Sequence, residues 1–210
     1  MDLPALLRER RLLAIVRGRR SGSVLEAVLT LASEGVRLIE VSLTSDGALD
    51  VLSRARAELG PEAVIGAGTV ITAQDARDAR AAGAEFIVTP GLSPGVSEAR
   101  ALDLPAIVGA LTPSEVIAAL AAGADAVKLF PASAVGGPEY LRALRAPFPD
   151  VPFVPVGGVD AESAGRYMES GAVAVGVGSP LIGDAADGGS ADALRERIHA
   201  FRGLTEEARR

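Results

Sequence analysis

Residues 121–131 of the chain read AAGADAVKLFP, and a similar stretch, AAGAEFIVTPG, occupies residues 81–91. In both, an alanine-rich segment with helical periodicity reaches a glycine, Gly83 or Gly123, and a short apolar run follows. Glycine often ends helices because it adopts a left-handed backbone conformation without a steric penalty. Both stretches therefore predict a helix that passes directly into a buried strand, and their similarity indicates a repeated structural unit.

The same alternation of short apolar runs and longer Ala/Leu/Arg/Glu-rich segments extends in both directions from these stretches. It gives eight predicted strands, at residues 12–16, 38–43, 64–66, 86–88, 106–108, 126–130, 153–156 and 173–177. Two further predicted helices end in glycine, at Gly35 and Gly171. Strands that alternate with helices in this way are typical of an α/β fold built on a parallel sheet.

Eight such units predict a TIM (β/α)8 barrel, which uses about 200 to 250 residues. An open doubly wound sheet would show a Gly-x-Gly-x-x-Gly turn after its first strand, and that turn is absent here. Capping boxes are predicted at Thr72/Asp75 and Thr112/Glu115. We expect one domain over residues 1–210, with a short N-terminal helix, a flexible loop at 184–190 and a frayed C-terminal tail.

The composition excludes several classes of partner and site. A formal charge of −6 disfavours nucleic acid, and 3% aromatic residues disfavour a stacking surface. The sequence contains neither a signal peptide nor an apolar run long enough to cross a membrane, so we expect a cytoplasmic protein. Cysteine is absent and the one histidine, His199, falls in the last predicted helix, so we expect no metal site and no cofactor.

The split among the basic residues is the most informative count. The 21 basic residues comprise twenty arginines and one lysine, Lys128. Arginine serves ion pairs and phosphate contacts well, but only the primary amine of lysine forms a useful imine with a ketone. The lone lysine is either a remnant of compositional drift or a reacting group, and its position in the predicted sixth strand favours the second interpretation.

The ends of the predicted strands carry polar groups and glycine turns, and in a TIM barrel these ends converge on one mouth. The groups there are Arg17, Glu40, Thr69, Thr89-Pro90-Gly91, Lys128, Val156-Gly157-Gly158 and Gly178-Ser179. The glycine turns after strands seven and eight predict a phosphate site, because bare backbone N–H groups can approach an anion there. The ligand should be small and polar.

Lys128 and Glu40 both interrupt otherwise apolar strands, where a charge is costly without a partner or a task. Burial and the nearby Arg17 should lower the pKa of Lys128, and burial should raise the pKa of Glu40 toward the range useful for moving protons. Two alternatives remain open at this point. The pair could be a structural ion pair, or Glu40 could merely orient the lysine.

The motifs together resemble a known family, the 2-keto-3-deoxy-6-phosphogluconate aldolases with their 6-phosphogalactonate and 4-hydroxy-2-oxoglutarate relatives. The matching pieces are AIVRG (14–18), IEV (39–41), GAGTV (66–70), TPGL (89–92), VKLFPA (127–132), PVGGV (155–159) and GS (178–179). The resemblance covers nearly the whole chain. It implies a cofactor-free class I aldolase of Entner–Doudoroff type on a TIM barrel, which is usually a trimer and yields pyruvate and glyceraldehyde 3-phosphate.

For individual residues, the resemblance implies that Lys128 forms the imine, Glu40 moves the protons and Thr69 binds the pyruvate carboxylate. Pro90 and Phe130, within the matching motifs, are expected to contact the substrate. Two positions depart from the gluconate-type pattern: Thr44 stands where arginine is usual, and Val156 where threonine is usual. Because valine cannot donate a hydrogen bond to the C4 hydroxyl, we expect relaxed epimer discrimination or a preference for the galactonate epimer.

Two alternatives to this function remain open from the sequence. A phosphate-binding barrel could isomerise or condense its substrate without an imine, or a barrel could bind a ligand without turning it over. The first would tolerate the replacement of Lys128 by arginine, and the second would release no pyruvate.

Overall fold

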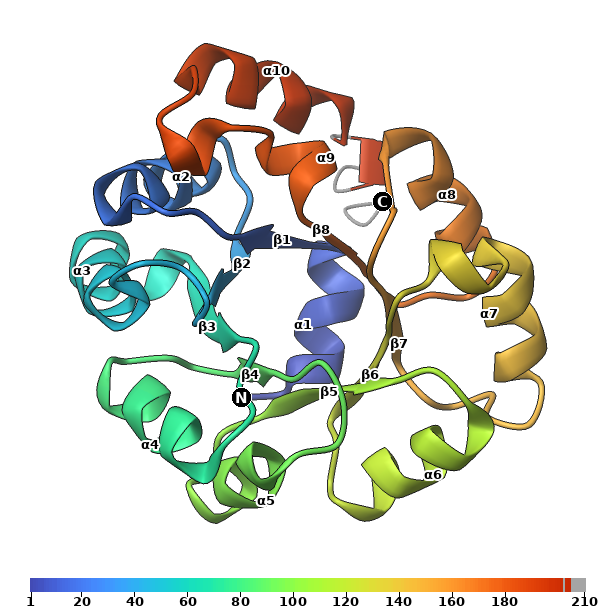
Figure 1. The fold of residues 1–210 in the computed structure, drawn as a ribbon. Coiled ribbons are helices and arrows are strands. Elements are labelled where there is room, and N and C mark those ends of the chain that lie inside the picture. Colours follow the sequence, from blue (N-terminus) through green and yellow to red (C-terminus); the bar gives the residue numbers. More distant parts are fainter. Residues whose placement is uncertain (202, 205–210) are drawn as a thin grey trace.

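The computed structural model describes residues 1–201 and 203–204, in which eight parallel strands form a ring with helices outside it (Figure 1). The strands are β1 (Leu12–Val16), β2 (Leu38–Ser42), β3 (Val64–Gly68), β4 (Ile87–Val88), β5 (Ala106–Ala110), β6 (Ala126–Leu129), β7 (Phe153–Pro155) and β8 (Val175–Val177). The principal helices are α1 (Leu3–Arg10), α2 (Ser21–Ser33), α3 (Ala48–Leu59), α4 (Ala73–Ala81), α5 (Pro94–Ala101), α6 (Pro113–Ala121), α7 (Gly137–Arg145), α8 (Ala161–Glu169), α9 (Ser179–Ile182) and α10 (Ala191–Ala200).

The ring closes between β7 and β8. The sheet order runs from β8 through β1 to β7, and an isolated parallel bridge joins Val156 to Gly176. The N–H of Val173 also donates to the carbonyl of Phe153 at 3.0 Å. A Cβ on Gly176 would lie 2.6 Å from Cγ2 of Val156, so glycine permits the approach of the two strands. The predicted TIM barrel is confirmed.

Helix α1 covers the end of the barrel at which the strands begin, and Figure 1 shows it inside the ring of strands. Asp2 caps this helix, because its Oδ1 accepts the N–H of Ala5 at 2.9 Å. Leu3 and Leu7 are fully buried and belong to one apolar cluster with Leu13 and other inward-facing strand residues. With this end filled by side chains, the opposite end is left for a site.

The helix signals predicted from the sequence are present. Both predicted capping boxes form, and a third, unpredicted one forms at Asp160/Ser163 at the start of α8. The predicted terminal glycines all adopt the left-handed conformation, with φ values of 88°, 92°, 90° and 94° at Gly35, Gly83, Gly123 and Gly171.

Several predicted boundaries were wrong by one or two residues. β3 and β5 continue to Gly68 and Ala110, β2 and β6 stop at Ser42 and Leu129, β4 begins at Ile87, and β8 begins at Val175. The residue at which a strand begins or ends depends on pairing with the neighbouring strand. Polar and glycine-rich strand ends therefore carry no clear sequence signal for these boundaries.

The stretch 184–190, predicted as a flexible loop, contains a 3-10 turn at Ala185–Asp187. Asp187 Oδ1 accepts the N–H of Arg19 at 2.6 Å, and Ala186 is buried against Gly18. The predicted frayed tail at 205–210 lies outside the described residues. No helix within the described part of the chain is long and apolar enough to cross a membrane.

Candidate active site

A cavity of about 490 Å³ opens at the ends of the strands, and it brings together the predicted strand-end residues except Thr89 and Gly91. Its lining includes Arg17, Glu40, Thr69, Pro90, Lys128, Phe130, Val156, Gly157, Gly158, Gly178 and Ser179. These residues come from seven of the eight strands or the loops that follow them. The geometry therefore supports their selection as one site, while their individual roles stay predictions.

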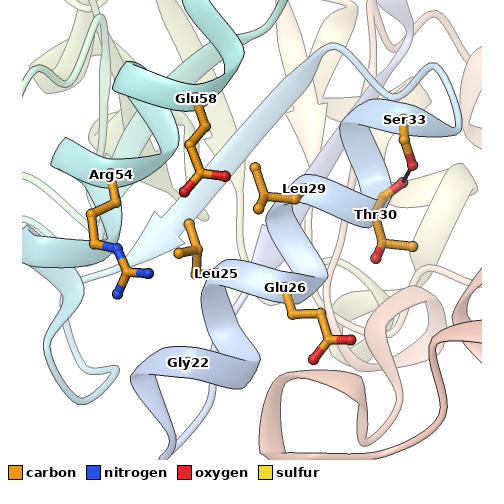
Figure 2. Close-up of a pocket in the computed structure, with 8 residues that line it drawn as sticks. All are labelled: Gly22, Leu25, Glu26, Leu29, Thr30, Ser33, Arg54 and Glu58. Carbon is orange, nitrogen blue, oxygen red and sulfur yellow. Dashed lines mark hydrogen bonds between the residues drawn. The ribbon is translucent and has the colours of Figure 1, made fainter.

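A second concavity of similar volume lies outside the barrel between α2 and α3 (Figure 2). Leu25 and Leu29 of α2 face Arg54 and Glu58 of α3 across it, and Glu26 also belongs to its lining. Its charged side chains belong to exposed helix surfaces, which favours an ordinary solvated groove. The two concavities have similar volumes. They differ in their lining, because only the cavity at the strand ends contains buried titratable side chains, Lys128 and Glu40.

Lys128 lies in the middle of β6, between Gly109 of β5 and Val154 of β7. Its side chain is 7% exposed, and its Nζ lies 4.9 Å from the centre of the Phe130 ring. Burial lowers the pKa of Lys128; the carboxyl of Glu40 opposes this shift, and the cation of Arg17 reinforces it. A lysine with a lowered pKa has a larger share of the neutral amine that attacks a ketone.

Glu40, in β2, is 1% exposed. Burial raises its pKa, although the positive charges of Lys128 and Arg17 pull in the opposite direction. Its Oε1 occupies the space beside Gly68, where a Cβ would overlap it. Its Oε2 has no hydrogen-bond partner in the described structure, which is costly for a buried carboxylate and leaves an acceptor free for a ligand or a water.

The structure also bears on the alternative of a structural ion pair. Among the described residues, no ion pair joins Lys128 to Glu40, although each influences the pKa of the other. The two groups are therefore close enough to interact electrostatically but are not locked together. Such an arrangement leaves both available to a ligand in the cavity.

A group of hydroxyls lies at the β1–β3 side of the cavity. Ser42, which the sequence analysis missed, is fully buried and lies within hydrogen-bonding distance of Thr69 Oγ1 (2.9 Å) and Thr44 Oγ1 (2.8 Å). Arg17 Nε donates to the same Ser42 oxygen at 3.4 Å. Ser42 follows Glu40 by two residues in one strand, so both side chains point to the barrel interior. This two-residue spacing from Glu40 was the sequence signal that could have identified Ser42 as a site residue.

The glycine turns after β7 and β8 form the opposite side of the cavity. Gly157 and Gly158 adopt φ values of 94° and 73°, which side chains rarely tolerate, and a Cβ on Gly158 would overlap Ser133 Oγ. In the described structure, the N–H groups of Gly158 and Ser179 donate to no other protein group. Free N–H groups beside helix starts are suited to an anion such as phosphate.

A family model for KDPG and KHG aldolases, named for 2-keto-3-deoxy-6-phosphogluconate and 4-hydroxy-2-oxoglutarate, matches residues 3–193. The chain belongs to this aldolase family. A KHG/KDPG aldolase of Escherichia coli strain K12 is 37% identical over 166 residues, which cover 78% of this chain and 78% of the E. coli protein.

Two solved structures of aldolases of this kind also resemble the chain. A 4-hydroxy-2-oxoglutarate/2-dehydro-3-deoxyphosphogluconate aldolase from TTHB1 is 37% identical with a TM-score of 0.84, covering 98% of this chain and 99% of that one. A native KDPGal structure is 31% identical with a TM-score of 0.87, covering 94% of this chain and 95% of that one.

Within this aldolase family, the two departures noted in the sequence now have a structural setting. Thr44 contacts Ser42 rather than presenting a cation to the cavity, and Arg17 reaches the same serine from β1. Val156 is 6% exposed and lines the cavity with an apolar surface. The cavity thus has an arginine beside the hydroxyls of its β1–β3 side but no hydroxyl at position 156.

Two further residues show where the structure differs from the predicted lining of the cavity. Thr89, predicted beside Pro90, is fully buried and accepts the N–H of Gly109 at 3.3 Å, so it supports the loop rather than lining the cavity. Asp187, whose Oδ1 accepts the N–H of Arg19, lines the cavity and was not predicted. The composition of residues 184–190 predicts a flexible loop, and it contains no signal that would place Asp187 in the site.

No group of three or more His, Cys, Asp or Glu side chains converges to hold a metal within the described residues. His199 lies on α10, where its Nε2 is 3.8 Å from Glu34 and the side chain is 54% exposed. This placement fits the predicted solvated or packing role for the histidine.

Proposed function

We propose that this chain is a class I aldolase that splits a 2-keto-3-deoxy-6-phospho sugar acid into pyruvate and glyceraldehyde 3-phosphate. The observation that carries the proposal is the chain's one lysine, buried in the cavity with a lowered pKa, near a buried carboxyl with a raised pKa. Membership of the aldolase family supports the same carbon–carbon lyase chemistry.

In the proposed reaction, the neutral amine of Lys128 adds to the 2-keto carbon and water leaves, which gives a protonated imine. Glu40, directly or through a water, takes the proton of the C4 hydroxyl. The C3–C4 bond breaks, the aldehyde forms, and the electron pair passes into the imine to give an enamine. Glu40 returns its proton to C3, and water then releases pyruvate and restores the amine.

The two sides of the cavity orient the substrate in this proposal. Arg17 and Thr69 take the carboxylate at the β1–β3 side, next to the lysine. The free N–H groups of Gly158 and Ser179 take the phosphate at the other side. Pro90 and Phe130 also line the cavity and contact the substrate in this proposal.

The test is reductive trapping. The protein is incubated with pyruvate and cyanoborohydride, and the adduct is located by peptide mass spectrometry. We expect an adduct on Lys128 in the parent chain and none at residue 128 in Lys128→Arg, which keeps the charge but cannot form the imine. Pyruvate release from the phosphorylated substrate should be lost in the same variant and should survive a metal chelator.

Other results would point elsewhere. Full activity of Lys128→Arg would favour an imine-free phosphate barrel, such as an isomerase or synthase. Substrate binding without pyruvate release by the parent chain would favour a non-catalytic binding barrel.

For the substrate, we propose turnover of both C4 epimers or a preference for the galactonate epimer, because Val156 offers no hydrogen bond to the C4 hydroxyl. Cleavage of 4-hydroxy-2-oxoglutarate to pyruvate and glyoxylate belongs to the same proposal, since it breaks the same bond. Competing kcat/KM values for the three substrates test it. Faster gluconate turnover with poor galactonate turnover would contradict the preference.

We further propose a homotrimer acting in the cytoplasm. Ile71 and Leu92 are large apolar residues, 49% and 55% exposed, on adjacent loops; the N–H of Gly95 donates to the Ile71 carbonyl at 3.2 Å. Such exposed pairs suit a subunit contact. Light scattering should give three times the chain mass, and Ile71→Asp with Leu92→Asp should reduce it. A monomeric parent chain would contradict this arrangement.

A further inference from the structure

Ser42 is the feature of the site that the proposed reaction does not use. Its side chain is fully buried between β1 and β3, and three polar side chains converge on its single oxygen. Thr44 Oγ1 and Thr69 Oγ1 lie at 2.8 and 2.9 Å, and Arg17 Nε lies at 3.4 Å. Of these three partners, Arg17 and Thr69 line the cavity.

Counting donors and acceptors restricts how this group can be arranged. A serine hydroxyl has one proton to donate and two lone pairs to accept. Arg17 can only donate, so it takes one of the lone pairs. Ser42 must then donate to one threonine and accept from the other for all three bonds to form.

The direction of donation among the three hydroxyl groups decides whether Thr69 presents a proton or a lone pair to the cavity. If Thr69 donated to Ser42, its lone pairs would face an incoming anion, which is unfavourable. If Thr44 donates to Ser42 and Ser42 donates to Thr69, the proton of Thr69 is free to point into the cavity. An anionic ligand therefore selects the second direction, and Arg17 reinforces it by polarising the Ser42 oxygen.

The backbone of Thr69 gives a second reason for a fixed partner. Thr69 has φ 59°, in the left-handed region that a β-branched residue rarely adopts. Such conformations cost about 1–3 kcal/mol and persist only where surrounding contacts hold them. The bond to Ser42 is a side-chain contact of this kind, anchored in the neighbouring strand β2.

We propose that Ser42 is a positioning residue for the keto-acid carboxylate, making Thr69 a hydrogen-bond donor and fixing Arg17 beside it. The proposal rests on the proposed function, because it takes the carboxylate to bind at this side of the cavity. It adds a residue that acts through its neighbours and does not itself touch the substrate.

The experiment measures how the rate of reductive trapping on Lys128 depends on ketone concentration. Pyruvate and methyl pyruvate are compared, since the ester keeps the keto group but lacks the carboxylate charge. For Ser42→Ala, we expect the half-saturating pyruvate concentration to rise about 10-fold, the order of one lost hydrogen bond to a charge. The value for methyl pyruvate should change less than about twofold, because the ester lacks that charge.

Ser42→Thr is the matched variant, because it keeps the hydroxyl and should restore most of the affinity for pyruvate. Thermal unfolding of each variant reports on packing separately. Equal losses for pyruvate and methyl pyruvate in Ser42→Ala, or no loss for either, would overturn the positioning role. A parent chain that forms no adduct on Lys128 would instead overturn the proposed function, and the role of Ser42 with it.

Discussion

The carboxyl group of Glu40 lies against Gly68, in the space that a side chain at position 68 would take. The barrel interior is mainly apolar, with Lys128 and Ser42 as further buried polar residues, and the glycine at position 68 leaves space for the titratable side chain of Glu40. Burial of that group raises its pKa, so the fold holds Glu40 in a state that is unfavourable for stability. Sites that accept such a cost are often functional.

Glu40→Gln should therefore lose activity and gain stability. Without a proton carrier, kcat should fall by about 10²- to 10⁴-fold. Removing a buried charge should raise the free energy of unfolding at neutral pH by about 1–3 kcal/mol. Urea unfolding and steady-state kinetics measure the two effects, with the exposed Glu58→Gln as the control.

The sign of the pH dependence follows from the raised pKa of Glu40. The native state holds this proton more tightly than the unfolded chain does, so its contribution to stability falls as pH rises from about 4.5 through the native pKa. Glutamine does not titrate. The stability advantage of Glu40→Gln should grow across that window and then level off; an advantage that shrinks with rising pH would contradict the raised pKa.

Arg17→Gln should shift the pH profile of reductive trapping to more alkaline values. The cation of Arg17 is one cause of the lowered pKa of Lys128, so its removal lets that pKa rise and reduces the neutral amine at a given pH. Trapping rates at saturating pyruvate give the profile. Arg19→Gln removes a charge two residues away, and we expect its profile to match that of the parent chain.

Val156→Thr should shift epimer preference toward the gluconate-type substrate. The new hydroxyl can donate to the C4 oxygen, and one such bond corresponds to about a 3- to 10-fold change in relative kcat/KM. Val156→Ala is the control for volume without a hydroxyl. If alanine and threonine produced the same shift, space rather than hydrogen bonding would explain the preference.

Gly176→Ala should destabilise the barrel at its point of closure. The added methyl group would meet Val156 Cγ2 at 2.6 Å and Ile15 Cδ1 at 3.3 Å, and we expect a loss of about 1–3 kcal/mol. Gly165→Ala, in α8 with open space around it, should instead add about 0.5–1 kcal/mol. Chemical denaturation of both variants checks the contrast, and equal effects would rule out a steric role for Gly176.

Most of the barrel could be predicted because its signals are local. A helix that ends at Gly83 or Gly123 and passes into an apolar run is visible within eleven residues. Lys128 and Glu40 could be selected because a charge inside an apolar strand needs an explanation wherever the strand lies. Their meeting in one cavity followed from topology, since parallel strands of a barrel end at one mouth.

What could not be predicted depends on contacts between distant segments. The sequence does not distinguish Ser42 from any other serine in a strand, because its contacts with Thr69 and Arg17 appear only in the folded structure. The turn at Ala185–Asp187 has a loop-like composition. It is held in place by contacts with Gly18 and Arg19, which lie near the N-terminus of the chain. The left-handed backbone of Thr69 has no sequence signal, because threonine rarely adopts it.

The lysine-poor composition has a practical consequence once Lys128 is placed in the cavity. Reagents that modify primary amines usually decorate the whole surface of a protein, whereas here they meet one buried side chain and the amino terminus. Modification of Lys128, measured separately from that of the amino terminus, would therefore report on access to the cavity. Competition by a ligand for that single label would measure occupancy directly, without an engineered probe.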